Sequence, residues 1–77
     1  MILTDGVHLV SDESLNELHD FARHIGLLPR WYQRGHYDLL GGRFERALQA
    51  GAVHVTTREL VRRMVGRGPR RGRRAKG

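Results

Sequence analysis

The chain has 77 residues, no cysteine and a formal net charge of +6 at pH 7. A chain of this length forms one domain with a small core, and the lack of cysteine excludes disulfide bridges and thiolate zinc sites. The sequence has neither an apolar run of the about 20 residues that a membrane span requires nor the apolar stretch of a signal peptide, so we expect a cytoplasmic protein without a membrane partner.

Two short apolar runs, residues 1–4 and 7–10, flank the dipeptide Asp5-Gly6. An Asp-Gly pair is a strong turn signal between two strands. The segment therefore predicts either a tight β-hairpin or a single bent strand, with Asp5 near a strand end and His8 within the second run.

A helix is predicted from Ser14 onward. Ser14 and Glu17 have the spacing of a capping box, in which the hydroxyl caps a free amide and the carboxylate reaches back. Apolar side chains then recur at three- and four-residue spacing on one face as far as Ile25, and Gly26 suits the end of the helix. His19 lies at the edge of that face, from which its side chain is expected to reach a sheet edge.

Residues 30–33 are predicted to form a strand, because they include Trp31 and Tyr32, which suit a pleated surface. Arg34-Gly35 then breaks the strand. We expect Trp31 in the core or at its rim; the functional alternative is a side chain that walls a pocket or stacks on a base.

The triplet His36-Tyr37-Asp38 is the most informative polar motif. In an extended segment residues i and i+2 share a face, so His36 and Asp38 are predicted to lie side by side. A carboxylate in that position orients an imidazole for general base catalysis, metal ligation or phosphate binding. The alternative is structural: Asp38 caps the following helix and His36 makes a local hydrogen bond.

A second helix is predicted over residues 43–50, a strand over 52–55 and a last helix after Thr56, which forms a second capping box with Glu59. The predicted element order is therefore β(β)α-β-α-β-α. Such alternation favours the α/β class, as a small single domain with a short mixed sheet and about three helices, and α+β is the alternative. The sequence predicts neither the strand order nor an oligomeric state.

The basic charge is concentrated at the C-terminal end: residues 1–61 hold six Arg and eight acidic residues, whereas residues 62–77 hold seven Arg, one Lys and no acid. We predict a globular domain over 1–66 and a disordered Arg/Gly tail over 67–77, because the tail lacks apolar side chains. Such a tail binds nucleic acid or another polyanion by releasing counterions, or it only aids solubility. Its predicted binding residues are Arg70, Arg71, Arg73 and Arg74.

Five histidines in this short chain raise the question of a metal site. A set made of His8, His19, His36 and Asp38 offers the nitrogen and oxygen ligands that zinc accepts. The sequence has no H-x-x-x-H or H-E-x-x-H spacing, so we assign no metal ligands and name no cofactor at this point.

Several segments together resemble a known family. They are H-L-V-S-D-x-S-L-x-E-L-H-x-F-A from His8 to Ala22, H-Y-D at 36–38, A-G-A-V at 50–53 and R-E-L-V-R-R at 58–63. With these segments the first 65 residues resemble the small bacterial and phage proteins grouped as domain of unknown function 4031, a family without a settled activity. The resemblance implies no particular reaction. Its signature positions are His8, Asp12, Glu17, His19, His36, Tyr37 and Asp38.

These observations favour a protein that binds a phosphate-bearing or nucleic-acid partner through a cluster of His, Asp and Tyr side chains. The first alternative is a small hydrolase or transferase for a nucleotide-like substrate, with His36 as base, Asp38 as its orienter and His19 as a further catalytic residue. The second is an interaction or adaptor protein with structural histidines. The functional interpretations require the histidines to gather in one polar hollow. Binding residues predicted for the domain are His8, Asp12, Glu17, Trp31 and Tyr37.

Overall fold

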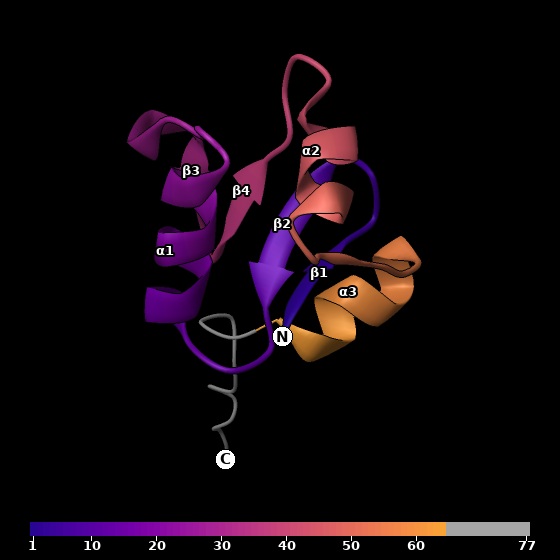
Figure 1. Cartoon of the computed structure of the whole chain (residues 1–77). Coiled ribbons are helices and arrows are strands. Elements are labelled where there is room, and N and C mark those ends of the chain that lie inside the picture. Colours follow the sequence, from indigo (N-terminus) through magenta and orange to yellow (C-terminus); the bar gives the residue numbers. More distant parts are fainter. Residues whose placement is uncertain (65–77) are drawn as a thin grey trace.

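The computed structural model describes residues 1–64, in which five short strands form one mixed sheet and helices cover both of its faces (Figure 1). The strands are β1 (Ile2–Thr4), β2 (His8–Ser11), β3 (Tyr32–Gln33), β4 (His36–Asp38) and β5 (Val53–His54). The helices are α1 (Leu15–His24), α2 (Arg43–Gln49) and α3 (Thr57–Arg63), with a 3-10 helix at Pro29–Trp31. The predicted α/β class is confirmed for this part of the chain.

The strand order is β3-β4-β2-β1-β5. All neighbours are antiparallel except β1 and β5, which are parallel. The β1–β2 pair is an antiparallel hairpin as predicted, but its connection spans residues 5–7 and is longer than the two-residue turn that Asp-Gly signals. The alternative of a bent single strand is wrong. Asp5 stabilises the turn because its Oδ1 accepts hydrogen bonds from the backbone amides of Val7 at 2.9 Å and His8 at 2.8 Å. Gly6 supplies the positive φ, 101°, that this turn needs.

The sheet separates two apolar clusters, because successive side chains of a strand point to opposite faces. Leu9 and Tyr37 pack with α1 and α2 on one face, whereas Leu3 and Val10 pack with Leu60 of α3 on the other. Figure 1 shows α1 and α3 on either side of the strands. The face that carries α3 therefore has the smaller core, and polar side chains occupy the rest of it.

In both predicted capping boxes the hydrogen bond to the cap hydroxyl is confirmed. Ser14 Oγ accepts from the Glu17 amide at 3.0 Å, and Thr56 Oγ1 accepts from the Glu59 amide at 3.1 Å. Neither carboxylate bonds back to its cap in the structure. Glu17 instead binds the Met1 amino group, and Glu59 binds arginines of α3, because a cation is a stronger partner for a carboxylate than a backbone amide.

The predicted strand over residues 30–33 is wrong in its first half. Pro29–Trp31 forms a 3-10 turn, in which the Trp31 amide donates to the Leu28 carbonyl at 2.9 Å, and only Tyr32–Gln33 joins the sheet. Proline fixes φ near the helical value at the first position of this turn, and that local preference outweighs the β propensity of Trp31.

The predicted boundary at residue 66 and the tail over 67–77, with Arg70, Arg71, Arg73 and Arg74, lie outside the described residues. Within residues 1–64, none of the helices combines the length and apolar character that a membrane span requires.

Candidate functional site: a histidine pocket between the sheet and α3

His8, His36 and Asp38 lie together on the face of the sheet that carries α3. His8 stands directly opposite Asp38 in the β2–β4 ladder, and His36 shares the face of Asp38 at i+2 spacing. The rings of His8 and His36 meet edge to face with centroids 5.0 Å apart. His36 Nε2 lies 3.5 Å from Asp38 Oδ1, so the predicted side-by-side placement of this pair is confirmed.

Asp5 orients the His8 ring from the end of β1. Its Oδ2 lies 3.1 Å from His8 Nδ1 and accepts the Thr57 hydroxyl at 2.7 Å. Its side chain is only 3% exposed. Burial by itself raises the pKa of Asp5, but the hydrogen bonds from Thr57 and His8 outweigh burial and hold this pKa well below its usual range. Asp5 is therefore a carboxylate at neutral pH, and it favours the His8 tautomer that donates from Nδ1.

A pocket of about 260 Å³ opens beside these side chains. Its polar wall holds His8, His36, Arg34 and Thr57, and α3 supplies an apolar wall that includes Leu60. Strand β2, the β3–β4 hairpin and α3 thus contribute polar side chains to one concavity, which is the usual form of a small-molecule site.

Arg34 reaches this pocket from a turn that suits its backbone poorly. It occupies, with Gly35, the two-residue connection between β3 and β4, where both residues have positive φ, 52° and 89°. Such turns favour Asn-Gly or Gly-Gly, and a left-handed conformation costs another residue about 1–2 kcal/mol. The guanidinium is thus held at the pocket despite an unfavourable backbone conformation.

His19 lies away from this pocket, so the expected gathering of all the site histidines is wrong for it. Its Nδ1 is 2.7 Å from Tyr37 Oη, and its ring contacts Tyr32 at 4.8 Å between centroids. Tyr37 alternates with His36 along β4 and points to the α1 face. Burial raises the pKa of the Tyr37 hydroxyl. His19 and Tyr37 therefore form a polar contact at the edge of the larger core.

Trp31 stands at the rim of the larger core. It is partly buried against that core, and the Arg43 guanidinium lies 5.2 Å from the centre of its ring. Trp31 does not line the histidine pocket. The structure thus places it where the core interpretation expects it.

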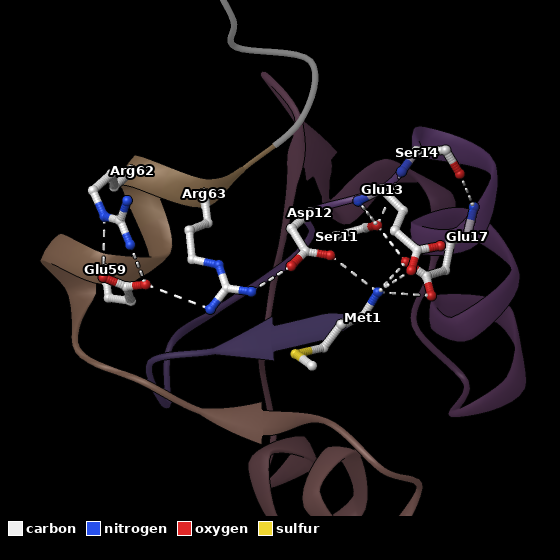
Figure 2. A network of polar contacts seen from close by, with 9 residues as sticks. All are labelled: Met1, Ser11, Asp12, Glu13, Ser14, Glu17, Glu59, Arg62 and Arg63. Carbon is white, nitrogen blue, oxygen red and sulfur yellow. Dashed lines mark hydrogen bonds and ion pairs between the residues drawn. The ribbon is translucent and has the colours of Figure 1, made fainter.

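Asp12 and Glu17 belong to an ion-pair network around the amino group of Met1 (Figure 2). That amino group lies 3.1 Å from Asp12, 3.2 Å from Glu13 and 2.9 Å from Glu17. Arg63 extends the network, because its guanidinium binds Asp12 at 2.5 Å and connects α3 to the end of β2. Neither acid lines the pocket, and both are paired within the chain.

This network predicts a loss of stability at alkaline pH. Burial lowers the pKa of the Met1 amino group, but hydrogen bonds to Glu17, Asp12 and Glu13 outweigh it and raise this pKa from 8.0 to about 10. The folded state therefore holds a proton that the unfolded state loses, and the contribution present below pH 8 is expected to vanish as the pH rises through 10. The loss is expected to stay below about 1 kcal/mol, since partly exposed ion pairs contribute little.

Urea unfolding between pH 7 and 10 measures this effect. The Glu17→Gln variant is expected to show a flatter decline with pH than the parent chain, because one partner of the amino group is neutral. An equal decline in both proteins would contradict the assignment of this pH dependence to the network.

The sequence places Asp5 near a strand end, and it does not single out Arg34 or Thr57 as site residues. Asp5 is detectable as the first residue of an Asx turn, in which its side chain must accept backbone amides. Arg34 is detectable because Arg-Gly stands in a two-residue hairpin turn, where Asn-Gly is the preferred dipeptide. No sequence pattern indicates Thr57, whose partner Asp5 is 52 residues away.

The fold and the pocket define a small α/β domain with a histidine-lined concavity on one face of its sheet. The chain belongs to the family described as protein of unknown function (DUF4031), which it matches over residues 5–67. The matched range includes Asp5 and every residue that lines the pocket. No curated protein and no solved structure matches the chain.

Proposed function

We propose that this protein binds a small phosphate-bearing ligand in the histidine pocket. The observation that supports the proposal is the placement of Arg34 and His36 in the wall of one concavity, beside His8 and Thr57. Guanidinium and imidazole N–H groups donate to phosphate oxygens, and arginine does so in a bidentate way that fixes the orientation of the ligand.

The backbone of Arg34 strengthens this proposal. An asparagine or glycine at this position would form the β3–β4 turn without the strain of a positive φ. A conformation of this kind is typical of functional positions, where the side chain is needed in spite of the backbone. An arginine in the wall of a pocket is well suited to phosphate binding.

The apolar wall indicates a ligand with an organic part. Leu60, Val61 and Met64 line the side of the pocket that α3 forms. The pocket is slightly smaller than the about 300 Å³ at which ligand cavities usually begin. A mononucleotide fits this description, with its phosphate at the polar wall and part of its surface left in solvent.

The basic C-terminal residues are proposed to add affinity for longer polyanions. Arg70, Arg71, Arg73 and Arg74 would neutralise phosphates of a nucleic acid without reading its sequence, since that segment has no aromatic side chain to stack on a base. Replacing these four arginines by Gln should therefore weaken oligonucleotide binding and leave mononucleotide binding unchanged.

Calorimetric titration of the full chain with adenosine 5′-monophosphate, at low salt and with a chelator present, tests the pocket. Arg34→Asn is expected to weaken binding at least about 10-fold, the effect of losing one charged hydrogen-bonding partner. The same substitution should maintain or raise the melting temperature, because asparagine tolerates the left-handed conformation. Opposite effects on binding and stability separate a functional role from a structural one.

The matched control is Arg30→Asn, which removes the same charge from an exposed position outside the pocket. It is expected to bind the nucleotide like the parent chain. Absence of binding by the parent chain, or equal binding by parent and Arg34→Asn, would overturn the proposal.

A second candidate function is hydrolysis or transfer of a phosphate ester, and the Asp5–His8 contact favours it. A buried carboxylate at 3.1 Å from Nδ1 leaves Nε2 as the acceptor of His8, as a general base requires. The base would then be His8 in addition to the predicted His36. Release of inorganic phosphate from nucleotides, abolished by His8→Gln with little change in melting temperature, is the expected sign of this activity.

A further inference from the structure

We propose that His8, His36 and Asp38 bind a divalent transition-metal ion, with Zn²⁺ as the ion whose ligand preferences fit best. The proposal goes beyond the binding of a phosphate-bearing ligand, because the ion needs no such ligand to bind. It is carried by the geometry of the three side chains and by the residues that support them.

The sheet holds the three side chains close together. One potential ligand atom from each of them lies within 4.8 Å of those from the other two. His36 Nε2 and Asp38 Oδ1 are 3.5 Å apart, close to the about 3.3–3.4 Å that separates two ligands of a tetrahedral zinc ion with bonds of about 2.0–2.1 Å. Because His8 faces Asp38 across β2 and β4, regular backbone and not a loop positions the set.

The support of His8 is of the kind that metal-binding histidines have. Such histidines usually donate their second ring nitrogen to a carboxylate, which fixes the tautomer and the ring orientation. Asp5 occupies this position with its Oδ2 at 3.1 Å from Nδ1, and Thr57 holds the same oxygen at 2.7 Å. The resulting order carboxylate, imidazole, ion leaves Nε2 of His8 as the ligand atom.

The donor set selects the class of ion. Two imidazoles and one carboxylate suit zinc and neighbouring transition metals, whereas Mg²⁺ and Ca²⁺ prefer oxygen ligands throughout. Three protein ligands also leave a fourth position of a tetrahedral ion for water or a ligand oxygen. The side chains of His8, His36 and Asp38 are 34%, 21% and 32% exposed, so the ion can enter from solvent.

A cation also accounts for the Asp38 carboxylate, which lies next to His36 at the pocket without forming part of its wall. Asp38 would repel the phosphate of a bound ligand if the pocket held only protein side chains. A divalent ion between the histidines and Asp38 replaces this repulsion by attraction. The other acidic group in the described residues, formed by Asp12, Glu13 and Glu17, already surrounds the Met1 amino group and has no such need.

Titration of the chelator-stripped, untagged full chain with Zn²⁺ tests the site, and Co²⁺ reports its geometry through visible absorption. We expect one ion per chain, the intense absorption of four-coordinate Co²⁺, and no comparable binding of Mg²⁺. His36→Gln and Asp38→Asn are each expected to weaken Zn²⁺ binding by at least about 30-fold. Loss of a residue that only supports a metal ligand already costs about 10–100-fold, and these two residues are ligands themselves.

His24→Gln is the matched control, because it removes an exposed histidine that does not line the histidine pocket. It should bind Zn²⁺ like the parent chain, and circular dichroism should show that all variants are folded. Equal Zn²⁺ affinity of parent, His36→Gln and Asp38→Asn, or absence of saturable binding, would overturn the metal site.

Nucleotide titration in the presence of chelator separates this inference from the proposed function. If the chain binds the nucleotide through Arg34 but fails to bind Zn²⁺, the metal site is wrong and the proposed function stands. If Zn²⁺ binds through His36 and Asp38 while the nucleotide does not bind with or without the ion, the metal site stands and the proposed function is wrong.

Discussion

Asp5→Ala is expected to lower the free energy of unfolding by about 3 kcal/mol at pH 7. The buried Asp5 carboxylate accepts the amides of Val7 and His8, the His8 ring nitrogen and the Thr57 hydroxyl. Alanine leaves these donors without their acceptor, so the β1–β2 turn and the attachment of α3 both weaken. Urea unfolding followed by circular dichroism measures the loss.

Two further variants separate the contributions of Asp5. Asp5→Asn keeps an acceptor for the turn and removes the charge, so we expect a loss of about 1 kcal/mol. Asp20→Ala removes a carboxylate that is 72% exposed and ion-paired with Arg23, and its effect should stay below about 0.5 kcal/mol. Similar losses for Asp5→Ala and Asp20→Ala would contradict the central role of Asp5.

Leu60→Ala is expected to destabilise the chain by about 3 kcal/mol, within the range for leucine in a well-packed core. Leu60 is 2% exposed and forms the buried cluster under α3 with Leu3 and Val10. This cluster is small, so few side chains are near enough to fill the cavity that alanine leaves. Chemical denaturation checks the value.

Loss of Leu60 should also weaken ligand binding, because α3 carries Thr57 and the apolar wall of the pocket. Leu40→Ala is the matched control: the same atoms are removed from a side chain that is 45% exposed, and the change should remain below about 0.5 kcal/mol. Equal destabilisation by the two substitutions would mean that α3 does not depend on Leu60 for its position.

Several features of the site could be predicted from the sequence because their signals are local. The side-by-side placement of His36 and Asp38 follows from the two-residue period of any strand. His19 was correctly placed at the edge of the apolar face of its helix, from which it reaches Tyr37. Its separation from His36 could not be predicted, since the sequence does not show which face of the sheet α1 covers.

The predicted binding residues that lie away from the pocket have a physical reason in common. Asp12 and Glu17 were predicted as binding residues, but the Met1 amino group and Arg63 neutralise both in the structure. A carboxylate has the same appearance in a sequence whether it faces a ligand or a cation of its own chain. Its partner is known only after distant segments have packed.

Elements whose signals lie within a few residues follow from the amino-acid sequence alone. The Asp5-Gly6 turn, the Ser14 and Thr56 caps and the spacing of apolar residues in α1 predict backbone conformations through local hydrogen bonds and side-chain periodicity. These interactions act between near neighbours, so no knowledge of the tertiary fold is needed to infer them.

Which of these elements meet depends on the tertiary fold. It placed His8 opposite Asp38, brought Thr57 to Asp5 and Arg63 to Asp12 across 52 and 51 residues, and separated His19 from the pocket. Strand pairing and register follow from burying both faces of the sheet at once, which is a property of the whole chain. The pocket therefore arises from packing, since its polar wall combines β2, the β3–β4 hairpin and the first residue of α3, which are distant in the sequence.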